Sequence, residues 1–413
     1  MLVILFCLVV SLAILPAMVL YNVARNHWEM NIKKPVFTLL VCSLLLESGA
    51  VYAQAIDNTV TRLMAANDVK GLAVALIDDG EVTFAKGYGH RMVEKDLALE
   101  TDTIMYGASL TKATFAYYVM QLVDDGIVDL DRPIAKYLPR PLPEYENWQD
   151  LAGDDRWRDL TFRILLSHRA GFANFRFFDR YGDFDRDGKL AIYFQPGSRY
   201  AYSGEGFLLA QFVLQEGLGL DVGKEMQSRI FDRFDMSNTS MTWRDDFADN
   251  YAHNYALDGT NVRHRVWDEV GAAGSMDTTL DDWSRFLAAV VRGEGLSEQS
   301  MKEMTNTQIR IRSVTQFPTL RDETTDEYDD IELGYGLGWG VFKTPRGHAF
   351  FKEGHDEGTA NYALCIQSEL SCILLMSNSV RAEGIFKELV DELYGETGLP
   401  WRWEGYTPYD WQE

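Results

Sequence analysis

Two groups of β-like segments lie at opposite ends of this chain, and their separation is what most restricts its fold. Near the N-terminus, apolar residues 72–77 and 82–88 flank Asp79-Gly80, a dipeptide typical of tight hairpin turns. Further apolar runs follow near the C-terminus, at residues 336–341, 348–351, 362–366 and 373–376. Helical periodicity predicts helices at residues 56–66, 110–125, 160–166, 207–216, 281–291 and 384–394. This order predicts an α+β fold, in which both ends of the chain build one sheet and a mainly helical lobe is inserted between them.

The N-terminus carries two apolar segments typical of membrane insertion or export. Residues 2–21 are nearly uncharged and long enough to span a bilayer. The second segment starts at Met30, has a basic pair at residues 33–34, continues with apolar residues 36–46 and ends with Val51-Tyr52-Ala53. A basic start, a short apolar run and small residues before a cleavage point are the parts of a signal peptide.

These segments predict a targeting region at residues 1–53 and one catalytic domain at residues 54–413. Two interpretations of residues 2–21 stay open: a membrane anchor, or an extension ahead of a functional start at Met30. Under either one, the domain is expected to be exported, as a periplasmic protein or as one anchored in the membrane and facing the periplasm. Cleavage of a signal peptide at residues 30–53 would make Gln54 the first residue of the mature protein.

The composition argues against two kinds of partner. The 413 residues carry a formal net charge of −23 at pH 7, whereas binding of nucleic acid needs a basic face. The four cysteines include no CxxC pair and no cluster with histidine at metal-ligand spacing, so no metal site is expected. Asp183, Asp185 and Asp187 resemble the start of a calcium loop, but its twelfth position is Phe194 instead of glutamate, which favours a simple turn.

Cys365 and Cys372 flank a short polar stretch at residues 367–371. If Ser368 and Glu369 form a two-residue hairpin turn, the two cysteines face each other across the strands. They would then form a disulfide in an oxidising compartment. Two buried free thiols are the alternative, because free cysteine packs well in protein cores.

The segment Ser109-Leu-Thr-Lys112 combines a nucleophile with a base. It follows apolar residues 104–106 and opens the helix expected at 110–125. Residues three positions apart share one face of a helix, so the lysine amine can reach the serine hydroxyl. The N-terminal end of a helix also favours negative charge that develops near Ser109. Taken alone, the motif is also explained by a surface helix that Ser109 caps.

Longer segments in a fixed order give this motif its context. They are residues 71–88, 120–131, 160–171, 195–204, 271–276 and 335–339. Together with the Ser109 motif they resemble the superfamily of serine β-lactamases and penicillin-binding proteins, especially its class-C-like branch, over about residues 56–395. The resemblance implies a β-lactamase/transpeptidase-like fold with an antiparallel sheet flanked by helices. It also implies that Ser109 is the nucleophile and Lys112 its base.

The second motif of the superfamily, Tyr-x-Asn, corresponds to Tyr202-Ser203-Gly204. The retained Tyr202 is expected to move protons between the nucleophile, the lysine and the leaving group. The asparagine amide, which contacts substrate and lysine in relatives, is replaced by Gly204. Ser203 and Glu205 are candidates to compensate for it, and turnover of β-lactams is less strongly expected than in those relatives.

The third motif, Lys-Thr-Gly or His-Thr-Gly, corresponds to residues 354–359. His355 takes the place of the lysine, while Asp356 and Glu357 replace threonine and glycine. The first glycine of the motif normally lets a substrate lie close to the strand, so Glu357 is expected to narrow or redirect the cleft.

The resemblance further implies an oxyanion hole, formed by the backbone N–H of Ser109 and that of Gly358 or a neighbour. His355 is expected to donate to a substrate carboxylate or to support Tyr202. A histidine that is hydrogen-bonded only to nearby backbone is the alternative. His168, which follows a serine within residues 160–171, is expected to be structural.

These motifs predict a serine hydrolase that forms an acyl-enzyme on an ester, amide or β-lactam bond, without metal or organic cofactor. The expected substrate is a small molecule or peptide, with peptidoglycan fragments as candidates for a D,D-peptidase or esterase. The alternative is a catalytically inactive binding or scaffold protein of the envelope, which the joint retention of Ser109, Lys112 and Tyr202 opposes. An α/β-hydrolase is disfavoured because Ser109 lacks the final glycine of Gly-x-Ser-x-Gly.

Overall fold

The computed structural model describes residues 34–411, and the side chains of residues 50–411. Two compact units make up the chain, residues 1–57 and residues 58–413, and helix α2 (Lys34–Ala66) extends across this boundary. The expected membrane segment at residues 2–21 lies outside the described residues, as does the start of the expected signal peptide. Within the described residues, no helix combines the length and the apolar character needed to cross a membrane.

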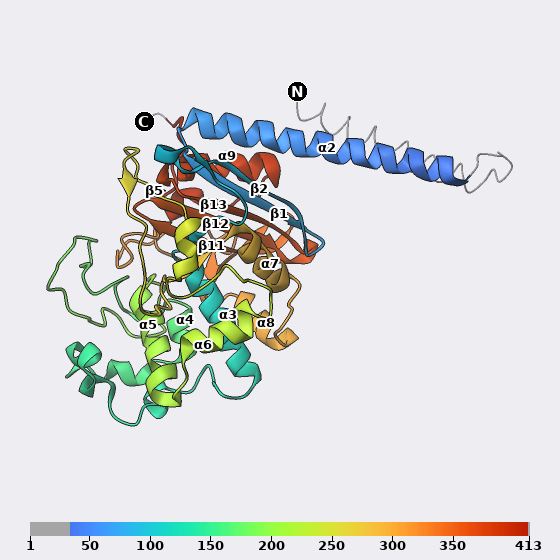
Figure 1. Ribbon diagram of the computed structural model, residues 1–413. Helices are drawn as coiled ribbons and strands as arrows, with labels where there is room; N and C mark the ends of the chain where they lie inside the picture. Colours follow the sequence, from blue (N-terminus) through green and yellow to red (C-terminus); the bar gives the residue numbers. More distant parts are fainter. Residues whose placement is uncertain (1–33, 412–413) are drawn as a thin grey trace. The chain divides into compact units, whose positions relative to one another are not determined.

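A nine-stranded antiparallel sheet forms the centre of residues 58–413 (Figure 1). Its strands, in spatial order, are β3 (Leu97–Ala98), β2 (Glu81–Met92), β1 (Gly71–Asp78), β13 (Ser371–Ser377), β12 (Thr359–Ile366), β11 (Gly347–Asp356), β10 (Gly340–Thr344), β9 (Gly334–Tyr335) and β8 (Ile309–Arg310). Strand β1 pairs with β13 from Leu72 opposite Ser377 to Ile77 opposite Cys372. The two ends of the chain therefore meet in one sheet, which confirms the predicted α+β fold.

Two short strand pairs lie outside this sheet. Strand β4 (Met105–Tyr106) pairs with β7 (Asp277–Thr278), and β5 (Asn254–Tyr255) pairs with β6 (Asn261–Val262). The first pair joins the backbone just before Ser109 to the end of the segment at residues 271–276.

Helices cover both faces of the sheet. The helices after α2 are α3 (Leu110–Asp124), α4 (Phe162–Leu166), α5 (Gly204–Phe212), α6 (Val222–Met226), α7 (Leu280–Val291), α8 (Glu298–Thr305), α9 (Glu383–Leu393) and α10 (Trp401–Glu404), of which α4, α5 and α6 belong to the helical lobe. Helices α3 and α7 lie on one face and α9 on the other (Figure 1). Residues 110–122 of α3 are all buried, so this helix runs through the core and is enclosed on every side. Lys112 is therefore held within the core of the molecule.

The strand expected at residues 336–341 is wrong in its first part. Residues 336–339 instead form a tight turn, in which the N–H of Gly336 donates to the Trp339 carbonyl at 2.8 Å. Gly338 has a φ of 83°, and a Cβ atom added there would lie 2.4 Å from the Cβ of Ala116 in α3. The turn thus depends on glycine for its backbone conformation and for its close approach to the helix.

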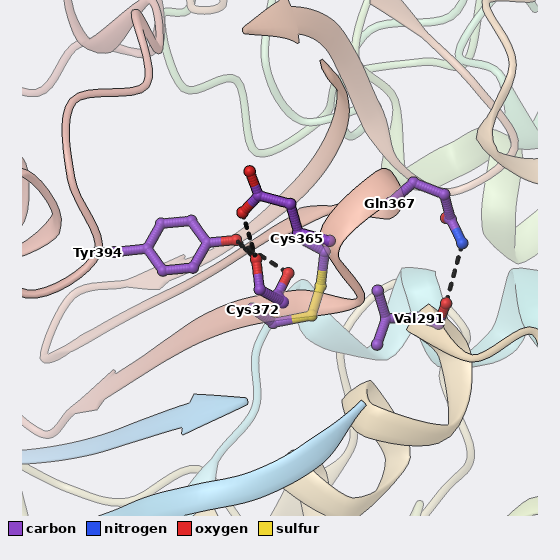
Figure 2. Close-up of a disulfide and its surroundings, with 7 residues drawn as sticks. Val291, Cys365, Gln367, Cys372 and Tyr394 are labelled. Carbon is purple, nitrogen blue, oxygen red and sulfur yellow. Dashed lines mark hydrogen bonds between the residues drawn. A yellow bond between two sulfur atoms is a disulfide. The ribbon is translucent and has the colours of Figure 1, made fainter. Parts of the chain in front are cut away.

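The hairpin of β12 and β13 contains the disulfide that the sequence suggested. Cys365 and Cys372 are directly opposed in the ladder and bonded to each other (Figure 2). The connection is a helical turn at Gln367–Glu369 followed by Leu370 with a φ of 49°. Figure 2 shows the Gln367 amide donating to the Val291 carbonyl at the end of α7, at 2.9 Å. The disulfide end of the hairpin is therefore fixed to the helix that covers this face.

Candidate active site

Ser109 lies at the junction between β4 and α3. After Tyr106 the backbone turns at Ala108, whose φ of 45° lies in the left-handed region that residues with a side chain rarely adopt. The Thr111 hydroxyl donates to the Ala108 carbonyl at 2.6 Å and accepts from the N–H of Met276 at 3.2 Å, which fixes this turn. Strained backbone of this kind occurs preferentially at functional sites. Here it directly precedes the serine that lines the cavity.

Lys112 lies one turn further along α3, and its amine is close to Ser109. The Nζ atom is 2.9 Å from Ser109 Oγ and donates to the Ala273 carbonyl at 2.6 Å. The side chain is 1% exposed. Burial and then the charge of Lys352 lower the pKa of Lys112 well below its ordinary value, although Glu353 acts in the opposite direction. A lysine in this state can act as a base toward the serine hydroxyl.

Tyr202 lies just ahead of α5 and completes the group of three. Its ring centroid is 5.1 Å from the amine of Lys112, and the residue is buried in the cavity wall. Burial and then the charge of Glu353 raise the pKa of Tyr202 well above its ordinary value, while a hydrogen bond with Ser109 opposes the shift. The phenol is therefore protonated at neutral pH and can act as a proton donor.

His168 supports this tyrosine. Its ring centroid lies 4.2 Å from that of Tyr202, and its Nδ1 atom accepts from the N–H of Ser203 at 2.9 Å. Burial, then the charges of Lys112 and Lys352, lower the pKa of His168 well below its ordinary value. A neutral, buried ring that packs on Tyr202 agrees with the structural role expected for this residue.

The candidates to replace the missing asparagine serve other purposes. The Ser203 hydroxyl donates to the Ala173 carbonyl at 2.8 Å and caps α5 by accepting from the N–H of Gly206. Glu205 forms an ion pair with Arg176 at 2.9 Å. Both side chains hold the loop in which Tyr202 lies. Because they are engaged in these contacts, they do not replace the asparagine amide.

His355 lies on β11 and lines the same cavity, with about half of its side chain exposed. Its Nδ1 atom contacts the carboxylate of Glu383. The amine near the Tyr202 phenol belongs instead to Lys352, three residues earlier on β11. The expectation that His355 supports Tyr202 is therefore corrected, whereas its position leaves it available to a bound substrate.

Gly358 lies in the two-residue turn that joins β11 to β12. A Cβ atom added to it would lie 2.5 Å from the Cβ of Asn254, so the turn packs against β5. Gly358 is not among the described residues that line the cavity. Gly354 of β11 lies close to the backbone before Ser109, since a Cβ added there would lie 2.7 Å from the Gly107 carbonyl. The predicted role of Gly358 in the oxyanion hole therefore has no support from the lining of the cavity.

The cavity has a volume of about 720 Å³ and a mixed lining. Its apolar wall comprises Phe175, Phe178, Tyr181, Leu208, Trp267 and Phe317. Its charged or titratable residues, besides Lys112, are Asp179, Arg265, Glu353, His355, Asp356 and Glu357. Ser109 therefore opens onto a largely aromatic space with several carboxylates at its edge, which suits a small substrate with apolar parts.

Comparison with known proteins identifies the family of this chain. A family model described as Beta-lactamase matches residues 56–392. The chain belongs to the Beta-lactamase family. The matched range contains all five residues predicted for the site.

Two curated relatives of this Beta-lactamase family member carry names of hydrolases. The Unguisins hydrolase ungD' of Aspergillus campestris is 26% identical over 263 residues, which is 58% of this chain and 47% of that protein. A D-aminopeptidase of Gluconobacter oxydans is 24% identical over 242 residues, which is 57% of this chain and 46% of that protein. The chain spans about half the length of these relatives.

A solved structure supports the fold of this Beta-lactamase family member. The D-alanine carboxypeptidase AmpC from Burkholderia cenocepacia superposes with a TM-score of 0.65 at 17% identity. The superposition covers 84% of this chain and 99% of the carboxypeptidase. At this identity the likeness establishes a shared fold.

The sequence analysis missed the charged pair Lys352 and Glu353. The two residues lie in the middle of β11 and are 0% and 5% exposed. A sequence signal was present, because they interrupt an apolar strand, and buried charges in such a place need partners. What the sequence alone did not show is that Tyr202, distant along the chain, is one of these partners.

Proposed function

We propose that the protein is a serine hydrolase that works through an acyl-enzyme on Ser109. The observation that carries the proposal is the 2.9 Å separation between Ser109 Oγ and the amine of Lys112. A serine hydroxyl is a weak nucleophile until a nearby base takes its proton. The buried lysine at the wall of a cavity is such a base.

In the first step, Ser109 Oγ attacks the carbonyl carbon of the substrate while its proton passes to Lys112 Nζ. The tetrahedral intermediate then collapses and the bond to the leaving group breaks. The leaving group receives a proton from Lys112, either directly or through Tyr202, which takes the Lys112 proton as it gives up its own. In the second step, Lys112 takes a proton from water as the hydroxide adds to the acyl carbon, and it returns that proton to Ser109 Oγ as the acyl bond breaks. Atoms and charges balance over the two steps, which sum to hydrolysis of one ester or amide bond.

The developing oxyanion needs donors that are already in place. The N–H of Ser109, at the first turn of α3, is the first proposed donor. The pairing of β10 with β11 ends at Gly340 and Phe351, and the next residues of β11 border the cavity. A backbone N–H from this stretch, between Glu353 and Asp356, is the second proposed donor and takes the place first given to Gly358.

For the substrate, we propose a short acyl donor joined through an ester or amide bond, with D-amino-acid derivatives the first to test. Relatives include a protein named D-aminopeptidase. The cavity supports a donor of modest size, since aromatic side chains such as Phe175 and Phe317 enclose much of it. Peptidoglycan fragments remain candidate substrates of this class.

We propose that the enzyme acts outside the cytoplasm, either in the periplasm or tethered to the membrane through residues 2–21. The signal-peptide pattern at residues 30–53 and the disulfide between Cys365 and Cys372 support this, since disulfides persist in oxidising compartments. N-terminal sequencing of the exported protein separates the two options. A periplasmic protein should start at Gln54, whereas a protein tethered through residues 2–21 should retain them, and a start at any other residue would contradict the proposed cleavage.

Turnover of p-nitrophenyl acetate and of D-alanyl esters and amides tests the proposed reaction. Ser109→Ala should lower kcat/KM at least about a thousandfold, because the nucleophile is lost. Ser198→Ala, at an exposed serine, is the matched control and should retain wild-type rates. Equal activity of Ser109→Ala and wild type would refute the mechanism. A wild-type protein inactive on the whole panel would favour the binding or scaffold alternative.

A further inference from the structure

A second lysine, Lys352, reaches the tyrosine of the active site. Its Nζ atom donates to the phenol oxygen of Tyr202 at 3.2 Å and lies 5.0 Å from the centroid of the ring. The amine of Lys112 lies 5.1 Å from the same centroid. Two buried lysine amines therefore surround one phenol, and they come from different elements, α3 and β11.

A buried counter-charge holds Lys352 in this position. Its amine lies 2.7 Å from Glu353 Oε1, which also accepts from the Gln316 amide at 3.2 Å. The side chains of the lysine and glutamate are 0% and 7% exposed. Removing two charges from water is unfavourable, so a buried ion pair contributes little to the stability of the fold. The position of this pair beside Tyr202 therefore points to a role in the site.

We propose that Lys352 is a positioning residue of the acyl-transfer reaction, which fixes the Tyr202 phenol and, as a positive charge near Lys112, favours the neutral amine that accepts the Ser109 proton. This inference rests on the function proposed above. Because Lys352 donates to the phenol oxygen, the proton of Tyr202 points toward a different atom that can accept it, and Ser109 and Glu353 are both hydrogen-bond partners of this phenol.

The charges that face Lys352 agree with an ammonium at this position. Burial lowers the pKa of Lys352, but the Glu353 carboxylate opposes this shift by charge and by hydrogen bond. Glu404 of α10 also faces the pair. Burial and then the charge of Glu353 raise the pKa of Glu404 well above its ordinary value, while the charge of Glu404 raises the pKa of Lys352. Glu353 bonds directly to the Lys352 amine and is therefore its main counter-charge. The positive charge of Lys352 in turn acts on Lys112 and lowers the pKa of that lysine.

The test is the pH dependence of kcat/KM for p-nitrophenyl acetate, whose acid limb reports the essential base of the free enzyme. In the wild type this limb should lie well below 10.5, the ordinary pKa of lysine, because Lys112 must be neutral to act. Lys352→Gln keeps a donor for Tyr202 but removes the positive charge and leaves Glu353 without its partner. Both changes raise the pKa of Lys112, so the limb should move up by about one pH unit or more.

Two further variants separate charge from hydrogen bonding. Lys352→Arg retains the charge, so its acid limb should stay near that of the wild type even if its rate falls. Lys352→Met removes both charge and donor, so its limb should rise as in Lys352→Gln and its kcat should fall further. Lys136→Met, at an exposed lysine outside the site, is the matched control and should match the wild type in both.

A merely structural role predicts a different outcome, in which folded Lys352→Gln loses rate but keeps the acid limb of the wild type, and this would overturn the inference. If Lys352→Gln does not fold, the double variant Lys352→Arg/Glu353→Gln tests the same charge effect in reverse. Its arginine keeps the positive charge while the opposing carboxylate is gone, so its limb should move below that of the wild type. An unmoved limb there would also overturn the inference.

These results are distinguishable from failure of the proposed function. If the wild type shows no turnover that depends on Ser109, the acyl-transfer proposal fails and takes the role of Lys352 with it. If the wild type turns over the ester through Ser109 while the variants keep its pH profile, only the role of Lys352 fails.

Discussion

At the scale of the residue, the site contains side chains whose pKa values differ from those in water. Lys112 is buried beside a second lysine, so its amine loses its proton more readily than an exposed one. Tyr202 is buried close to a carboxylate, so its phenol keeps its proton. Ser109 therefore contacts both a lysine that can accept a proton and a phenol that can donate one, as the proposed acyl transfer requires.

Replacement of Tyr202 by phenylalanine tests the acid. Tyr202→Phe removes the phenol proton but keeps the ring that packs on His168, so the protein should fold. The expected result is a fall in kcat of about 10² to 10⁴, the usual contribution of a positioned proton donor. Steady-state kinetics together with a thermal melt measure it. A folded variant with the wild-type kcat would show that the phenol takes no part in the rate-limiting chemistry.

The sequence predicted these residues to different extents. The spacing of Ser109 and Lys112 is a local property of a helix, so their contact could be predicted without any tertiary information. The contact of Lys352 with Tyr202 could not, because it requires β11 to lie beside a loop far away along the chain. The sequence also did not show that Gly358 lies in the β11–β12 turn and packs against Asn254, outside the lining of the cavity.

At the scale of the element, hairpins and turns determine where the strands around the cavity lie. The predicted hairpin of β12 and β13 has the register that opposes Cys365 and Cys372, because alternation in the strands and a polar turn specify it. The predicted strand at residues 336–341 failed where Gly338 approaches α3, a contact that the local pattern does not contain. Local periodicity therefore predicted the β12–β13 hairpin correctly, but it did not predict the turn at residues 336–339.

The disulfide should stabilise this hairpin. It closes a short loop, with a sequence separation of 7, so removing it should lower the free energy of unfolding by about 2 kcal/mol. Chemical unfolding of the double variant Cys365→Ala/Cys372→Ala against wild type measures the change, and wild type with reductant is the control that keeps both sulfur atoms. Unfolding curves that are the same in all three samples would contradict a structural role for the bond.

At the scale of the whole molecule, the fold brings together chemistry from three parts of the chain. Ser109 and Lys112 come from the start of α3, the Tyr202 phenol from the loop before α5, and the charged pair from β11. The antiparallel sheet makes this arrangement possible, since its N-terminal and C-terminal strands close on the central helix. Membership of the Beta-lactamase family agrees with this architecture.

The central claim is that Ser109 becomes acylated, and intact mass spectrometry of the purified protein tests it most directly. After brief exposure to p-nitrophenyl acetate and an acid quench, the wild type should gain one acetyl group that Ser109→Ala does not gain. Peptide mapping should place that group on residue 109. Equal acetylation of the two proteins, with no released product that depends on Ser109, would contradict the account.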